Sequence, residues 1–232
     1  MDSTSISPVS ASTTTANQVD RKIQGYSGKL AKAKSIKWEL EQVKYIRGVS
    51  DQTNTLSNIA FEIAKAGLEK NQLSELYEKA LGIAHALSDR YQGLAFRNIA
   101  SAMAEAGLFK KALEVAQTIY GIEKADALTN TASAMAKAGL NKSEVGIVFE
   151  KALEAVRDYN HSCYVSPSSS LSVEEGENIA STYLNIASAM AEAGLFKRAL
   201  EVTKSMLWGK YQESAVANIT SAMNKARLKK AR

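Results

Sequence analysis

Side chains that could carry out covalent chemistry or bind a metal are scarce in this chain. Its 232 residues include one cysteine and two histidines, so a single chain cannot form a disulfide or supply four Cys or His ligands to a structural zinc ion. His161 and Cys163 lie two positions apart, but a nucleophile and its base normally come from distant parts of a chain and need a third, orienting group. No phosphate-binding loop, zinc-protease motif or hydrolase motif occurs. We therefore expect a protein that is not an enzyme and that holds no metal or cofactor.

The most regular polar feature is a row of five asparagines, each nine positions before a glycine, or before an arginine in the last copy. An asparagine amide has two donor hydrogens and an acceptor oxygen, so such a row could hold the main chain of a bound peptide without selecting a side chain. It could equally bond an adjacent repeat and set how repeats stack, since polar groups at a buried edge are usually satisfied within the protein. The sequence leaves both interpretations open. The row consists of Asn58, Asn98, Asn130, Asn185 and Asn218.

These asparagines belong to a repeated segment that we expect to be helical. The copies read LSNIAFEIAKAGL, FRNIASAMAEAGL, LTNTASAMAKAGL and YLNIASAMAEAGL, with a fifth, VANITSAMNKARL, near the end. Apolar residues recur three and four positions apart, as in Leu56, Ile59 and Ile63, which is the pattern of a helix with one buried face. The glycine suits the left-handed position that ends a helix. A second helix follows each glycine, and because one helix pair cannot cover its own apolar face, the copies must stack.

The segment AFRNIASAMAEAGLFKKALEVAQTI resembles a tetratricopeptide repeat, a helix-turn-helix unit of about 34 residues. The resemblance covers roughly residues 52–228, although the closing proline of the family is missing and aliphatic residues mostly replace its aromatic ones. It implies an all-α fold, a right-handed α-solenoid of stacked antiparallel helix pairs. It also implies that the first helices line a concave groove where a peptide segment of a partner protein docks. The groove residues would then be Asn58, Arg97, Asn98, Ser101, Asn130, Ser133, Asn185, Ser188, Asn218 and Ser221.

The repeats divide the chain into segments. We expect a disordered Ser/Thr-rich tail at residues 1–20 and a capping helix or half-repeat at 21–50. The units then span about 52–92, 93–124, 125–178 and 179–211, followed by a partial unit at 212–232. The third unit carries extra residues that we assign to a surface loop at 160–178.

The charge distribution bears on the class of partner. The chain carries a net charge of +5, but residues 51–222 hold 16 basic and 20 acidic residues, so the basic excess lies at the two ends. Pentatricopeptide repeats, which are similar helix pairs that bind RNA, are the alternative class. However, the spacings of 40, 32 and 55 between the four glycines, and of 33 from the last glycine to Arg227, break a track of one base per repeat. We expect a protein or peptide partner, whose identity the sequence leaves open, and regard nucleic acid as unfavoured.

A second row of charged residues alternates in sign: Lys65, Glu105, Lys137, Glu192 and Lys225. We expect it to form weak ion pairs between repeats on the surface, with a recognition rim for a charged ligand as the alternative.

The amino-terminal segment and the overall hydropathy bear on location. The segment lacks the basic start and apolar block of a secretory signal, and no apolar run is long enough to span a membrane. We expect a soluble, cytoplasmic scaffold. The Ser/Thr-rich start resembles the export signals of bacterial type III effectors, so export by a non-Sec route, as an effector or a secretion-associated adaptor, is the alternative. The sequence does not indicate an oligomeric state.

Overall fold

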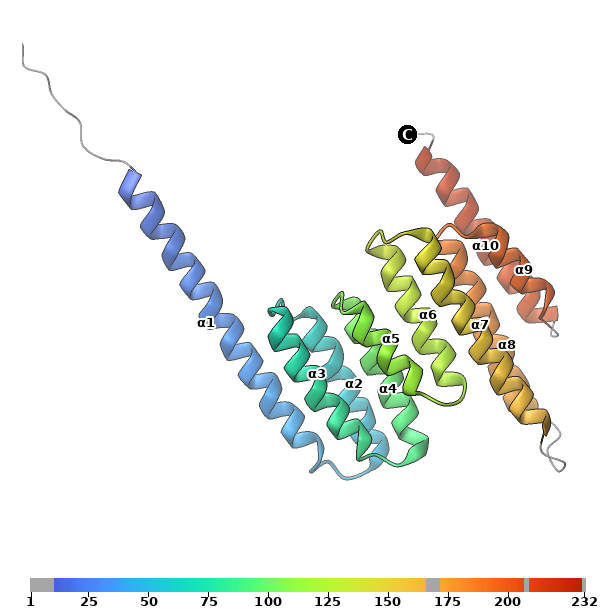
Figure 1. Cartoon of the computed structure of the whole chain (residues 1–232), viewed down its shortest axis with the longest axis horizontal. Helices are drawn as coiled ribbons and strands as arrows, with labels where there is room; N and C mark the ends of the chain where they lie inside the picture. Colours follow the sequence, from blue (N-terminus) through green and yellow to red (C-terminus); the bar gives the residue numbers. More distant parts are fainter. Residues whose placement is uncertain (1–10, 166–171, 207–208, 231–232) are drawn as a thin grey trace, which may run out of the picture.

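The computed structural model describes residues 11–165, 172–206 and 209–230 (Figure 1). These residues form ten α-helices and no strand, so the expected all-α class is confirmed. In chain order the helices are α1 (Ala11–Val43), α2 (Val49–Lys65), α3 (Lys70–His85), α4 (Asp89–Glu105), α5 (Phe109–Thr118), α6 (Ile122–Lys137), α7 (Lys142–Val165), α8 (Val173–Glu192), α9 (Phe196–Lys204) and α10 (Gly209–Lys230).

The repeated glycines end the first helices, as their spacing predicts. Gly107 has a φ of +77°, in the left-handed region where a side chain is disfavoured. Its N–H donates to the carbonyl of Ala104, and the N–H of Leu108 donates to the carbonyl of Met103. This pair of hydrogen bonds is a Schellman motif, which satisfies carbonyls at the end of α4. The same two bonds recur after α6 and α8, at Gly139 and Gly194.

The helices pack in a repeating order. The first helices α2, α4, α6, α8 and α10 contact one another in sequence, and each second helix contacts its own first helix and the next one. Figure 1 shows the units side by side from α1 to α10, with the amino-terminal half of α1 projecting past α2 and α3. Small residues allow this close approach, because the recurring alanine of the first helix is fully buried in four copies. These alanines are Ala60, Ala100, Ala132 and Ala187.

Large apolar side chains fill the space between first and second helices. Leu56, Phe96 and Leu128, at the same position of three copies, are between 0% and 4% exposed. Val216 holds that position in α10 and is 41% exposed, because no second helix follows it in the described part of the chain. Tyr77 on α3 is fully buried and donates a hydrogen bond of 3.2 Å to the carbonyl of Ala60.

Two expected boundaries need correction. Helix α1 begins at Ala11, so residues 11–20 are helical and not a disordered tail. The helix can start this early because no proline interrupts the chain from Ala11 to the end of the helix at Val43. Residues 1–10 of the expected tail lie outside the described part. The expected loop at 160–178 is shorter, because α7 continues to Val165 and α8 starts at Val173. Ser172 and Glu175 form a capping box at that start. Residues 166–171 of the expected loop are not described.

The last helix also extends beyond the repeat pattern. Helix α10 runs through Arg227 to Lys230, where the other copies turn at a glycine. Arginine adopts the left-handed conformation less readily than glycine does, so the helix continues. Residues 231–232 of the partial unit are not described. None of the helices described in the structure is long and apolar enough to cross a membrane.

Candidate functional site

Two adjoining cavities open across the first helices, and we refer to them together as the groove. Their volumes are about 550 and 410 Å³. They share four lining residues, Phe61 from α2, Ser101 from α4, and Asn130 and Ser133 from α6. The first cavity extends toward the ends of α4 and α6, and the second extends onto α8. The groove therefore crosses four successive first helices.

The groove contains seven of the ten residues that the sequence analysis assigned to it. These are Arg97, Asn98, Ser101, Asn130, Ser133, Asn185 and Ser188. The other three, Asn58, Asn218 and Ser221, lie on α2 and α10 and line neither cavity.

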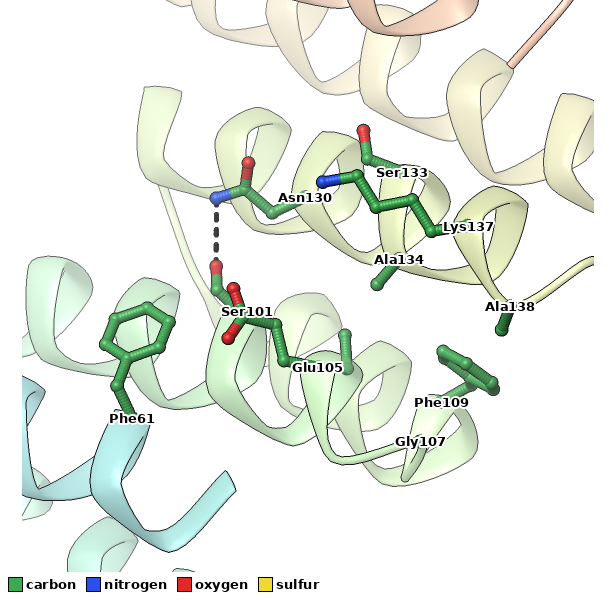
Figure 2. A pocket seen from close by; sticks show the side chains of 11 residues that line it. Phe61, Ser101, Glu105, Gly107, Phe109, Asn130, Ser133, Ala134, Lys137 and Ala138 are labelled. Atoms are coloured by element: carbon green, nitrogen blue, oxygen red, sulfur yellow. Dashed lines mark hydrogen bonds between the residues drawn. The ribbon is translucent and has the colours of Figure 1, made fainter. Parts of the chain in front are cut away.

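Three asparagines of the row join successive first helices. Asn130 Nδ2 on α6 donates to Ser101 Oγ on α4 over 2.9 Å (Figure 2), and Asn218 on α10 donates to Ser188 on α8 over the same distance. Asn98 on α4 donates instead to Ser57 on α2 over 2.8 Å. The difference arises because Phe61 occupies the serine position in the first copy. These three amides hold neighbouring repeats together.

Asn185 is different from these three. Its exposed amide lines the second cavity, and no side-chain hydrogen bond from it to another described residue is found. The equivalent partner would be Ser133 on α6, whose hydroxyl donates to the carbonyl of Thr129 over 2.8 Å. The junction between α6 and α8 therefore lacks the asparagine–serine bond of the other junctions. Asn185 has its donors and acceptor available to a ligand.

Arg97 and Asp126 form a half-buried ion pair in the wall of the second cavity. Arg97 Nη1 lies 3.5 Å from Asp126 Oδ2, and Arg97 Nε and Nη2 each donate to Asn98 Oδ1 over 3.1 Å. Burial raises the pKa of Asp126, while the charge of Arg97 acts to lower it. This arginine is engaged by groups of the protein itself.

The alternating row of charges does not form the expected ion pairs. Glu105 and Lys137 line the first cavity and Glu192 lines the second, and all three are exposed. Among the residues that the structure describes, no ion pair within 4.0 Å includes them, Lys65 or Lys225. Ion pairs between repeats instead use other residues, on second helices as in Lys111–Glu78 at 2.9 Å and on first helices as in Lys210–Glu177 at 2.6 Å.

An apolar wall, which the repeat pattern did not predict, completes the first cavity. Figure 2 shows Phe61 at one end of the cavity and Phe109 at the other. Ala104, Ala134 and Ala138 line it between them. The signal for Phe61 was that it replaces the serine that follows the asparagine by three positions in the other copies. For Phe109, at the start of α5, no comparable signal existed.

A third, smaller cavity of about 200 Å³ lies between α1 and α3, away from the groove. In the described ranges, no three His, Cys, Asp or Glu side chains gather so as to hold a metal ion. Searches of protein-family models, of curated proteins and of solved structures find no match to this chain.

Proposed function

We propose that this chain is a tetratricopeptide-like, right-handed α-solenoid that acts as a non-enzymatic interaction module. It binds an extended peptide segment of a partner protein in the groove. The observation that carries this proposal is the pair of adjoining cavities across α2, α4, α6 and α8, which contain seven of the ten residues that the family resemblance assigns to a docking face.

The chemistry of the groove supports a peptide as the ligand. Pockets of about 300–1,000 Å³ with apolar walls and a few polar groups are typical of ligand sites. The apolar wall of Phe61 and Phe109 suits a ligand side chain, and the free amide of Asn185 suits ligand main-chain groups. The groove thus offers both kinds of contact that an extended peptide needs.

The charges of the groove disfavour RNA. Its lining carries three carboxylates, Asp126, Glu105 and Glu192, against two cations, Arg97 and Lys137. Arg97 is engaged with Asp126. Phosphate binding requires an excess of available cations, so the groove suits a neutral or mixed-charge peptide better than a nucleic acid.

Selection of random peptides displayed on phage against the full chain tests the proposal, because it needs no known partner. Binding of the selected peptides is then measured with Ala138→Tyr, which fills the first cavity. Ala86→Tyr is a matched control, since both alanines are exposed and cap a helix in right-handed conformation, but Ala86 lines neither groove cavity. We expect binding to be lost with Ala138→Tyr and kept with Ala86→Tyr. Peptides that bind both variants equally would contradict a groove site.

A further inference from the structure

The alternating charges recur once in each first helix, and three of them, Glu105, Lys137 and Glu192, line the groove. Each of α2, α4, α6, α8 and α10 contributes one, from Lys65 to Lys225, and the signs alternate along the row. All five side chains are exposed. Because they form no ion pair with other described residues, their charges are available to a ligand.

The spacing of the row limits the conformation of a ligand that would match it. Neighbouring first helices are in contact, and packed helices lie about 8–10 Å apart. A polyproline-II helix rises about 3.1 Å per residue with three residues per turn, so every third side chain lies on one side, about 9 Å apart. In a β-strand, side chains on one side are about 6.6 Å apart, which does not fit one charge per repeat. The row therefore matches a polyproline-II segment.

We propose that the groove recognises a polyproline-II peptide whose charges alternate at every third residue, a specificity that rests on the function proposed above. A basic side chain of the ligand pairs with Glu105, an acidic one with Lys137 and a second basic one with Glu192. Apolar residues between them enter the first cavity, against Phe61 and Phe109. Lys65 and Lys225 extend the same pattern beyond the two cavities.

The test uses labelled synthetic peptides and fluorescence polarisation. KPLEPLK carries the matching pattern and EPLKPLE the opposite one, while KPEPKLL keeps the composition of KPLEPLK but places charges at every second residue. We expect KPLEPLK to bind the wild-type chain at least about threefold more tightly than the other two, since each of the three exposed pairs contributes about 1.4-fold to fivefold. The repeats are net acidic, with 16 basic and 20 acidic residues at 51–222, so non-specific attraction would also favour the more basic KPLEPLK over EPLKPLE. KPEPKLL has the same net charge as KPLEPLK, so the comparison of these two peptides separates the charge pattern from the net charge.

A reciprocal variant provides the control. Combining Glu105→Lys, Lys137→Glu and Glu192→Lys changes only exposed side chains, and circular dichroism verifies its fold. We expect this variant to prefer EPLKPLE. Equal binding of all three peptides, lost with Ala138→Tyr, would overturn the charge pattern but leave the peptide-binding function standing.

Two further outcomes would overturn the inference. One is a failure of KPLEPLK to bind; the function proposed above is then judged separately by the phage selection, which assumes no charge pattern. The other is a dimer of the chain in sedimentation velocity that Lys137→Glu dissociates, because the row would then contact a second copy.

Discussion

The amide of Asn130 on α6 donates a hydrogen bond of 2.9 Å to the hydroxyl of Ser101 on α4, and this contact ties two successive repeats together at the floor of the groove. Ser101 also donates to the carbonyl of Arg97 over 2.8 Å. The same row of asparagines thus includes residues that stack repeats and, within the groove, Asn185, which leaves its amide available.

We expect Asn130→Ala to lower the free energy of unfolding more than Asn185→Ala does, by about 0.5–1.5 kcal/mol, because only the first removes a hydrogen bond between repeats. Both substitutions replace asparagine by alanine within a helix, so the gain in helix propensity is similar and cancels in the comparison. Urea unfolding followed by circular dichroism measures the difference. Equal stabilities would mean that the bond to Ser101 contributes nothing to stacking.

Asn185→Ala should instead weaken peptide binding. The loss of one neutral hydrogen bond to a ligand corresponds to about threefold to tenfold in Kd. Asn58→Ala is the matched control, since Asn58 occupies the same position on α2, is exposed and lines neither cavity of the groove. Isothermal titration calorimetry with a phage-selected peptide compares the two. The assignment of Asn185 fails if both variants bind as the wild type does.

The cost of truncating the large apolar position should depend on the repeat. Leu128 on α6 is 1% exposed, whereas Val216 at the equivalent position of α10 is 41% exposed. Leu128→Ala should cost about 2–5 kcal/mol through lost burial and a cavity, and Val216→Ala less than about 1 kcal/mol. Thermal unfolding of both variants checks this. A cost for Val216→Ala as large as that for Leu128→Ala would show that this face of α10 is covered in solution.

Asp126 should make stability depend on pH in a defined direction. Burial raises its pKa above the ordinary value of an aspartate, so the folded chain binds the proton more tightly than the unfolded chain does. Its contribution to stability is then fully present below the unfolded pKa and is lost as the pH rises through the folded pKa. We therefore expect Asp126→Asn to gain stability relative to the wild type between about pH 3 and pH 7. Urea unfolding at several pH values measures this. A relative loss would mean that the pair with Arg97 outweighs burial.

The helical units could be predicted because their signals are local. Glycine after alanine at Gly107 and Gly139 predicted where first helices end, and the periodic apolar residues predicted which faces are buried. The capping box of Ser172 and Glu175 was a readable signal of the start of α8, and it would have shortened the expected loop. The start of α1 at Ala11 was missed because its Ser/Thr-rich composition favours disorder when considered alone.

The groove was harder to predict because it depends on distances between helices. The sequence identified the asparagine row, but whether Asn130 or Asn185 bonds a neighbour depends on the spacing at each junction. The apolar wall combines Phe61 from α2 with Phe109 from α5, which are 48 positions apart. Ion pairs were expected along the alternating row of charges, yet the pairs between repeats use other residues, such as Lys111–Glu78 on second helices and Lys210–Glu177 on first helices.

Photo-crosslinking tests the central claim, peptide binding in the groove, most directly. A phage-selected peptide that carries a benzophenone side chain at an apolar position is irradiated with the full chain, and mass spectrometry locates the attachment. We predict attachment to α2, α4 or α6 and to Phe109, around the first cavity, with Ala138→Tyr abolishing it. Attachment mainly to the outward faces of α3, α7 or α9, or attachment unaffected by Ala138→Tyr, would contradict the claim.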